Sequence, residues 1–208
     1  MKNKDIFTFR DAEKQAGPVA FSTMLKPAGS ACNLDCGYCY YLDKAAQYGG
    51  RQAVMADDLL ELYIRQYIEA NEVPVVTFCW HGGEPLLLGR DFYRRAVALQ
   101  RKYAAGKRIE NTLQTNGTLV DEAWCELFAE NGFLVGLSLD GPEDIHDAFR
   151  RTKGGRPTFA RVMRTVGMFR RTGVEYNTLS VVNRACEGRG AETVSYTHLR
   201  AHETGRNL

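Results

Sequence analysis

The sequence lacks an excess of charge of either sign and lacks any long apolar run. Its 27 Lys and Arg residues nearly balance 25 Asp and Glu residues, so the formal net charge is +2. This balance gives no electrostatic reason to expect nucleic acid or an anionic membrane surface as a partner. No apolar run approaches membrane-spanning length, and the first residues lack the apolar core of a signal peptide. We therefore expect a cytoplasmic protein that binds neither nucleic acid nor membrane.

The composition argues against disorder and against a fold that is stabilised by disulfides. Hydrophobic residues make up 44% of the chain and charged residues 25%, which is ordinary for a globular protein. A length of 208 residues is enough for one well-buried domain. The six cysteines of a cytosolic chain indicate metal or redox chemistry rather than structural disulfides.

Apolar runs alternate with amphipathic stretches, which is typical of βα units around a parallel sheet. We predict strands near residues 20–26, 74–79, 108–114, 133–139 and 175–182. We predict helices near residues 57–70, 91–104, 121–130 and 158–171. A sheet with crossovers of this kind closes, or partly closes, into a barrel. Five strands are too few for a complete eight-stranded barrel. The predicted fold is α/β, a partial (β/α) barrel truncated after about five strands.

Two kinds of residue mark the ends of the predicted helices. Asp57 and Asp121 stand where N-caps are expected, and Gly132 and Gly173 follow helix ends. These positions support the helix boundaries given above.

The last fifteen residues differ from the rest of the chain. Residues 194–208 show no apolar periodicity and do not continue the helix that residues 187–192 should begin. Back-translated, Val194 to Thr204 can be written as a string that resembles a transposase adapter used in short-read sequencing libraries. The alternative is a natural polar tail. We expect residues 1–193 to be the native core and residues 194–208 to be a non-native tail.

Three cysteines stand together in the segment CNLDCGYCYYLDK, directly after the first predicted strand. Cys32, Cys36 and Cys39 are spaced as C-x3-C-x2-C. Soft thiolates select zinc or iron–sulfur clusters, and three on one loop can hold three irons of a cube, leaving the fourth open. Zinc is the main alternative, although closed structural zinc normally takes four protein ligands. The other cysteines lie on separate predicted elements, where we expect burial as small apolar residues: Cys79, Cys125 and Cys186.

The segment WHGGEP ends the second predicted strand. Gly82 and Gly83 would let the backbone approach a ligand closely, and Glu84 could complement an ammonium group. A plain strand-to-loop turn is the alternative, and the nearby cysteines favour the ligand site. His81 could equally orient this loop or act chemically.

Polar residues also follow the next two predicted strands, in QTNGT and LSLDGP. Gln114 and Asn116 are two residues apart and so lie on the same face of their strand, and the same holds for Ser138 and Asp140. Each pair could therefore point into a barrel mouth. The Asn-Gly and Asp-Gly pairs also form turns. The two interpretations are compatible, because barrel active sites lie where strands turn into loops.

The cysteine spacing, with Tyr38 before the third cysteine, resembles the defining motif of the radical S-adenosylmethionine superfamily. Four segments are similar to the anaerobic sulfatase-maturating enzymes, between about Phe21 and Asn183: CNLDCGYCYYLDK, TFCWHGGEPLL, LQTNGTLVDEAWCELFAENGFLVGLSLDGPEDIHDAFR and YNTLSVVN. The resemblance implies a [4Fe–4S] cluster bound by Cys32, Cys36 and Cys39. It also implies contacts with S-adenosylmethionine for Tyr38, Gly82, Gly83, Glu84, Ser138 and Arg150.

The resemblance further implies a reaction. Reductive cleavage of S-adenosylmethionine would release methionine and a 5′-deoxyadenosyl radical, which takes a hydrogen atom from the β-carbon of a sulfatase cysteine or serine. Oxidation would then give Cα-formylglycine. The implied partners are an unfolded or nascent sulfatase polypeptide and a low-potential electron donor such as ferredoxin or flavodoxin.

Two other functions stay open from the sequence. A related peptide-modifying enzyme would form a thioether or another crosslink on a ribosomal peptide, and a zinc-binding structural module would hold a closed metal site. The sulfatase-maturating enzymes carry a C-terminal domain with further cysteines for auxiliary clusters and an acidic residue proposed as base. That domain is absent from this sequence, so we assign no catalytic acid or base and expect incomplete turnover.

Overall fold

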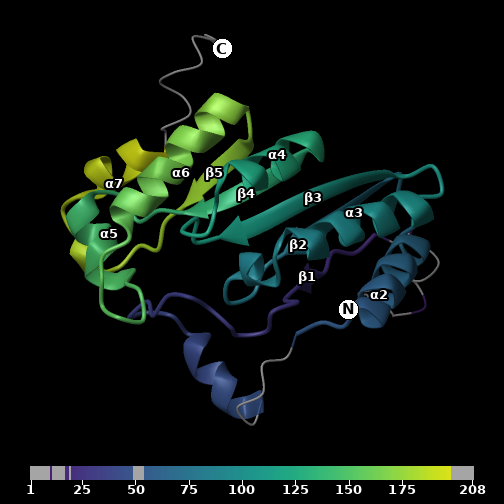
Figure 1. Cartoon of the computed structure of the whole chain (residues 1–208), viewed down its shortest axis with the longest axis horizontal. Coiled ribbons are helices and arrows are strands. Elements are labelled where there is room, and N and C mark those ends of the chain that lie inside the picture. Colours follow the sequence, from purple (N-terminus) through teal and green to yellow (C-terminus); the bar gives the residue numbers. More distant parts are fainter. Residues whose placement is uncertain (1–9, 11–16, 19, 49–53, 198–208) are drawn as a thin grey trace, which may run out of the picture.

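One five-stranded parallel sheet forms the centre of the computed structural model, which describes residues 10, 17–18, 20–48 and 54–197 (Figure 1). The strands are β1 (Met24–Leu25), β2 (Val75–Trp80), β3 (Arg108–Thr115), β4 (Phe133–Ser138) and β5 (Glu175–Leu179). They lie in sequence order, and each is parallel to the next. Sequential parallel strands with helical crossovers are the arc of a (β/α) barrel. The predicted partial barrel is therefore confirmed.

The helices that follow the strands cover one face of this sheet (Figure 1). Four of them match the predicted ones: α2 (Asp57–Ala70), α3 (Arg90–Tyr103), α4 (Glu122–Glu130) and α6 (Phe159–Thr172). Four short helices were not predicted from the sequence: α5 (Glu143–Phe149) and the 3-10 helices η1 (Leu42–Tyr48), η2 (Pro85–Leu88) and η3 (Arg184–Cys186). None of the helices among the described residues has the length and apolar character needed to cross a membrane.

The core lies between the sheet and these helices and is rich in aromatic rings. In β2, alternate residues are buried, and the ring of Trp80 packs edge-on against Tyr93 with centroids 5.6 Å apart. The ring of Tyr93 in turn contacts that of Trp124, also at 5.6 Å. Because strand side chains alternate between faces, the residues between the buried ones point to the opposite, inner face of the arc. That inner face is where the cavity described below lies.

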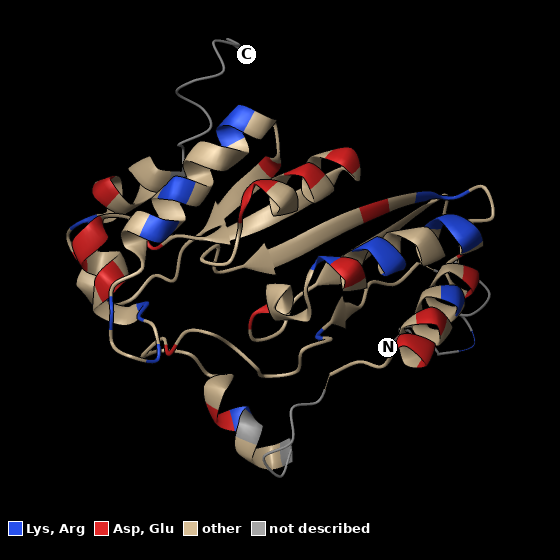
Figure 2. Cartoon of the chain, in the orientation of Figure 1, with Lys and Arg blue, Asp and Glu red and all other residues tan. Residues whose placement is uncertain are grey.

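The helices alternate in charge around the outside of the fold. Basic residues are the more frequent charged residues on α3 and α6, and acidic residues on α2, α4 and α5 (Figure 2). Ion pairs join neighbours of opposite charge, such as Lys102 to Glu61 at 2.7 Å and Arg171 to Glu122 at 2.7 Å. Exposed pairs of this kind each contribute about 0–1 kcal/mol, so packing rather than charge stabilises the layers.

The first and last strands are shorter than predicted, and side-chain hydrogen bonds explain the difference. Before β1, the backbone N–H of Phe21 donates to Oδ1 of Asn71 at 3.1 Å instead of to a strand. After β5, the N–H of Val181 donates to the carboxylate of Asp140 at 2.9 Å. The predicted strand ranges 20–26 and 175–182 were therefore too long, because each included loop residues held by side chains.

Three of the four predicted helix-end residues are confirmed. Oδ1 of Asp121 accepts the N–H of Trp124 at 2.9 Å as the N-cap of α4. Gly132 and Gly173 follow helix ends with φ of 61° and 71°, which glycine adopts without steric cost. The prediction for Asp57 was wrong, because α2 begins at Asp57 itself and Ala56 takes the cap position without a side-chain bond.

The last described helix, α7 (Gly190–Thr197), runs through the point where the sequence predicted a break. Thr193 is buried, and the ring of Tyr196 lies 6.0 Å from that of Phe159. The prediction that residues 194 onward do not continue a helix was wrong as far as Thr197. Residues 198–208 lie outside the described residues, and the non-native origin of residues 194–208 stays a prediction.

The turn after β2 docks on the chain that leads into the cysteine segment. The N–H of Gly83 donates to the carbonyl of Gly29 at 2.9 Å, and the N–H of Glu84 donates to that of Ala31 at 2.7 Å. A Cβ at position 83 would lie 2.1 Å from the carbonyl oxygen of Ala31. The sequence predicted that Gly83 allows close approach to a ligand. The structure shows a close approach of Gly83 to the protein's own backbone, and its contact with a ligand stays a prediction.

We predict that Asp121→Ala lowers the free energy of unfolding by about 1 kcal/mol more than Asp57→Ala, because only Asp121 is an N-cap. The two residues are a matched pair, since each also forms an exposed ion pair with an arginine at 2.9 Å. Urea denaturation of both variants measures the difference. Equal losses would show that the cap bond contributes nothing.

We predict that Gly83→Ala lowers the free energy of unfolding by about 1–3 kcal/mol, because the added methyl group forces the two backbone segments apart. Gly167→Ala in α6 is the control, since its Cβ would meet only Nη1 of Arg171 at 3.8 Å. That control should leave stability unchanged or raise it, because alanine favours helix over glycine. A Gly83→Ala variant as stable as the control would contradict the docking.

Candidate functional site

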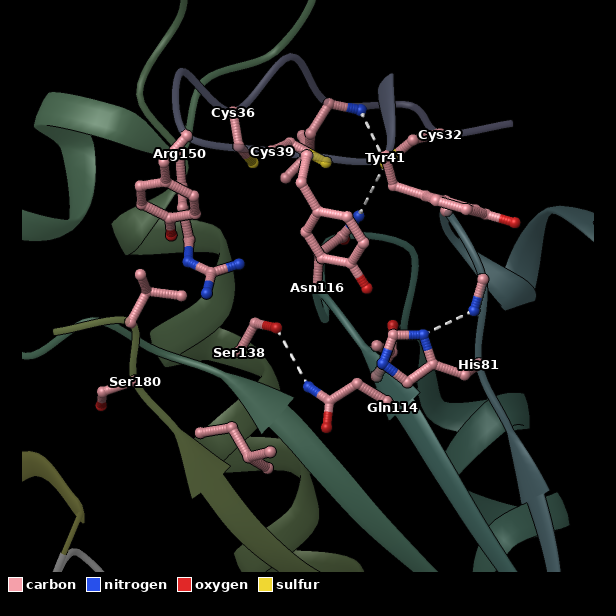
Figure 3. A pocket seen from close by; sticks show the side chains of 18 residues that line it. Cys32, Cys36, Cys39, Tyr41, His81, Gln114, Asn116, Ser138, Arg150 and Ser180 are labelled. Atoms are coloured by element: carbon pink, nitrogen blue, oxygen red, sulfur yellow. Dashed lines mark hydrogen bonds between the residues drawn. The ribbon is translucent and has the colours of Figure 1, made fainter. Parts of the chain in front are cut away.

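A cavity of about 400 Å³ lies at the carboxyl edge of the strands (Figure 3). Its walls come from the loop of residues 30–41, here called the cysteine loop, from the turn after β2, and from the carboxyl ends of β3, β4 and β5 with the chain that follows them. The carboxyl edge of parallel strands is where (β/α) barrels build active sites. The structure brings most of the sequence-predicted residues to this cavity: Cys32, Cys36, Cys39, Tyr38, Gly82, Gly83, Ser138 and Arg150.

The cysteine loop takes its shape mainly from a second loop, between α5 and α6. The N–H of Asp35 donates to the carbonyl of Arg151 at 2.8 Å, and the N–H of Gly37 donates to that of Phe149 at 3.0 Å. Leu34 is buried and forms an isolated antiparallel bridge with Thr152. The loop is therefore anchored between its cysteines as well as before them.

The three thiols of the cysteine loop are half-buried, and none forms a disulfide. Burial raises the pKa of Cys36 to about 11, against the lowering effect of the Arg150 charge, and burial also raises the pKa of Cys32. The sulfur of Cys32 accepts the N–H of Leu34 at 3.4 Å and the amide of Asn116 at 3.8 Å. Metal binding would deprotonate such thiols, because the thiolate is the ligand.

This donor set fits an iron–sulfur cube. Across the described ranges, no three His, Cys, Asp or Glu side chains converge closely enough to hold one metal ion. A [4Fe–4S] cluster is bound differently, with one thiolate on each iron, so its ligands line a cavity instead of meeting at one point. The three thiols do so, and N–H groups next to a ligand sulfur are one of the features that tune such clusters.

The other three cysteines do not line this cavity. Cys125 and Cys186 are buried, as the sequence analysis expected, whereas Cys79 is only half-buried. The cavity therefore offers three cysteine ligands and leaves a fourth iron of a cube without a protein thiol.

Arg150 and Asp140 form a buried ion pair beside the thiols. Nε and Nη2 of Arg150 donate to the two carboxylate oxygens of Asp140 at 2.8 and 3.0 Å, and the hydroxyl of Tyr38 donates to the same carboxylate. Burial alone would raise the pKa of Asp140, but the hydrogen bonds and charge of Arg150 hold that pKa below its ordinary value. The guanidinium also lies 5.5 Å from the centre of the Tyr38 ring. Arg150 thus lines the cavity as a fixed positive charge (Figure 3).

Neutral polar groups form the opposite wall. Nε2 of Gln114 donates to Oγ of Ser138 at 3.1 Å, between neighbouring strands. Nδ1 of His81 accepts the N–H of Gly82 at 2.7 Å, and burial lowers the pKa of His81, which favours the neutral ring. His81 therefore orients the turn and also lines the cavity, whereas a chemical role for it stays a prediction.

Two residues expected at the site do not line the cavity: Glu84 and Asp140. Glu84 is 0% exposed, and its carboxylate accepts hydrogen bonds from the N–H groups of Leu86 and Asn116 and from the hydroxyl of Thr115. Burial raises the pKa of Glu84 to about 7. Glu84 therefore ties the turn to the end of β3, and its contact with an amino group stays a prediction. The expectation that Asp140 points into the barrel mouth was wrong, because it faces Arg150.

Several cavity residues were not predicted from the sequence. Tyr41 lines the cavity with its ring 4.0 Å from Nζ of Lys26, and Leu179 at the end of β5 lines it together with Ser180 and Val181. The rule that sites follow strand ends would have found the last three. No spacing signal identifies the pairing of Lys26 with Tyr41, because it depends on how the cysteine loop folds back.

Comparison with known proteins gives the same assignment as the motifs. The family model described as the radical SAM superfamily matches residues 27–184. The chain is 50% identical over 161 residues to a serine-type anaerobic sulfatase-maturating enzyme of Bacteroides thetaiotaomicron, covering 77% of this chain and 39% of that protein. It is 41% identical over 163 residues to a cysteine-type enzyme of Clostridium perfringens, covering 77% and 44%.

Solved structures show the same fold. A structure described as native anSMEcpe with bound AdoMet and Kp18Cys peptide superposes with a TM-score of 0.79 at 37% identity, covering 86% of this chain and 48% of that one. The chain thus spans less than half the length of these relatives. The match of the family model over most of the chain shows that the chain belongs to the radical SAM superfamily.

Proposed function

We propose that this chain binds the [4Fe–4S] cluster and S-adenosylmethionine of a radical enzyme that converts a sulfatase serine or cysteine to Cα-formylglycine. The observation that carries the proposal is the gathering of Cys32, Cys36 and Cys39 with Arg150 and Ser138 around one cavity. Support comes from relatives named as anaerobic sulfatase-maturating enzymes and from solved structures of the same fold with bound AdoMet and peptide.

The residues of the chain have distinct tasks in this proposal. When bound, the cluster supplies a one-electron reduction of S-adenosylmethionine that generates a hydrogen-abstracting 5′-deoxyadenosyl radical. Cys32, Cys36 and Cys39 would hold the cluster through three of its irons, and the fourth iron would stay open to the cofactor. Arg150 offers a positive charge to the carboxylate of the cofactor. Asp140 fixes the position of this charge through two hydrogen bonds. Ser138 and Gln114 add neutral polar groups on the facing wall.

The substrate and partners belong to the same proposal. The substrate would be an unfolded or nascent sulfatase polypeptide in the cytoplasm, and the electron would come from a low-potential donor such as ferredoxin or flavodoxin. Relatives named serine-type are 44–50% identical and those named cysteine-type 39–42%, so peptides with either residue are suitable probes. Residues 1–193 would supply the radical SAM core of a longer enzyme whose further domain completes turnover.

We predict that the chain, reconstituted anaerobically with iron and sulfide, binds about four irons. Cys36→Ala should lose this iron, because one corner of the cube would have no ligand. Cys125→Ala is the matched control, since Cys125 is a residue of α4 that is buried in the core and does not line the cavity. Iron analysis and the visible absorption of the cluster measure both. Similar iron loss in the two variants would mean that the ligands are assigned wrongly.

We predict that the reconstituted chain with dithionite cleaves S-adenosylmethionine to 5′-deoxyadenosine and methionine, which chromatography detects. The intact longer enzyme should also convert a sulfatase peptide to an aldehyde, seen with an aldehyde-reactive probe and by mass spectrometry. Cleavage without any aldehyde, but with an intramolecular thioether in a cysteine-containing peptide, would favour a crosslinking relative. Absence of cleavage by a chain that holds its cluster would contradict the proposed function.

A further inference from the structure

A ring of hydrogen bonds lies behind Arg150, on residues that do not line the cavity. His146 on α5 and Thr158 at the start of α6 are 0% and 1% exposed. Neither was singled out by the sequence, and neither has a task in the proposed mechanism. Burying a polar side chain costs free energy unless its donors and acceptors form hydrogen bonds within the protein, so the partners of these two residues are informative.

The partners of these two side chains define their donors and acceptors. The N–H of Asp140 donates to Nδ1 of His146 at 3.3 Å, so that nitrogen carries no proton. The hydroxyl of Thr158 donates its single hydrogen to the carbonyl of Arg150 at 2.6 Å. The 3.1 Å contact between His146 and Thr158 is therefore a bond from Nε2–H of the imidazole to Oγ1 of the threonine. Both donors of these side chains, Nε2–H of His146 and the hydroxyl of Thr158, therefore form hydrogen bonds.

The ring joins the backbones of the two residues whose side chains form the ion pair. It runs from the backbone of Asp140 through His146 and Thr158 to the backbone of Arg150 and closes through the ion pair. Thr158 is also held from its other side, since its N–H donates to Oδ1 of Asp147 at 2.7 Å. Arg150 is thus constrained at both its main chain and its guanidinium.

We propose that His146 and Thr158 are positioning residues for Arg150. They keep the part of its guanidinium that does not bind Asp140 directed into the cavity. The identity of the ligand, the carboxylate of S-adenosylmethionine, rests on the proposed function, whereas the positioning itself does not. A long arginine side chain loses rotamer entropy when a ligand orders it. The ring orders it in advance, so that the loss occurs on folding and not on binding.

The test compares two buried threonines. Thr158→Val removes the hydroxyl of the ring and keeps the branched shape of the side chain. Thr165→Val is the matched control, because Thr165 is also 1% exposed and its hydroxyl donates to the carbonyl of Gly117 at 2.7 Å, outside the ring. If the role of Thr158 were only structural, both variants would shift thermal stability alike and leave Arg150 alike.

The first measurement needs no cofactor. In the full chain, NMR follows hydrogen exchange of the Arg150 Nε–H, which donates to Asp140, and Arg150→Lys identifies the signal by removing it. We expect exchange to be about tenfold faster in Thr158→Val and unchanged in Thr165→Val. Equal exchange rates in the two variants would overturn the positioning role, whether or not the chain binds S-adenosylmethionine.

The second measurement is the dissociation constant for S-adenosylmethionine in the iron-reconstituted chain. It should rise about tenfold in Thr158→Val and stay unchanged in Thr165→Val, the size expected for one lost hydrogen bond in a binding network. A wild-type chain that does not bind the cofactor would refute the proposed function, and the exchange rates would still decide the positioning. Should Thr158→Val not fold, His146→Asn replaces it. Asparagine keeps an acceptor for the Asp140 amide but not the contact with Thr158, so Arg150 exchange should again be faster.

Discussion

The carboxylate of Asp140 joins four segments of the chain at one edge of the sheet. It follows β4, accepts the guanidinium of Arg150 after α5, accepts the hydroxyl of Tyr38 in the cysteine loop, and accepts the N–H of Val181 after β5. Removing one partner of a buried ion pair is costly, because the other charge is then left uncompensated in the low-dielectric interior of the protein. Asp140 avoids that cost by having all its hydrogen bonds satisfied. Through these hydrogen bonds, Asp140 connects Tyr38, Arg150 and Val181, which all line the cavity.

The cysteine loop illustrates how a binding site can be built from irregular chain. Its own hydrogen bonds are few, and its form comes from the turn at Gly83, from the backbone of Phe149 and Arg151, and from Asp140. Each of these lies at the carboxyl edge of the sheet or directly after it. The sheet therefore positions the thiols indirectly, through loops that dock on one another. This arrangement places a soft ligand set next to a permanent positive charge.

Much of the fold followed from periodicity, and the errors have local causes. The five strands and four long helices were predicted because apolar residues alternate or recur every three to four positions along them. The seven-residue α5 was missed because it is short and its N-cap is Pro142, which gives no capping hydrogen bond. Asp57 was taken as an N-cap because aspartate is common there, but α2 starts one residue earlier than that role allows.

The candidate site was predictable where it rests on motif spacing and not where it rests on packing. The cysteines, the glycine pair and Ser138 line one cavity, as their positions after strands predict, and Arg150 lines it too, as the family resemblance implied. Glu84 and Asp140 turn away from it, because buried donors satisfy them elsewhere. His146 and Thr158 gave no signal, since their effect on Arg150 arises from three-dimensional contacts between α5 and α6.

We propose that three thiols hold a cluster with one iron open to S-adenosylmethionine. Electron paramagnetic resonance of the reconstituted, dithionite-reduced chain is the sharpest test of this proposal. We expect the signal of a reduced [4Fe–4S] cluster, and a change in that signal when S-adenosylmethionine is added, because the cofactor would become a ligand of the open iron. A colourless zinc-bound chain, or a cluster signal that S-adenosylmethionine leaves unchanged, would contradict it.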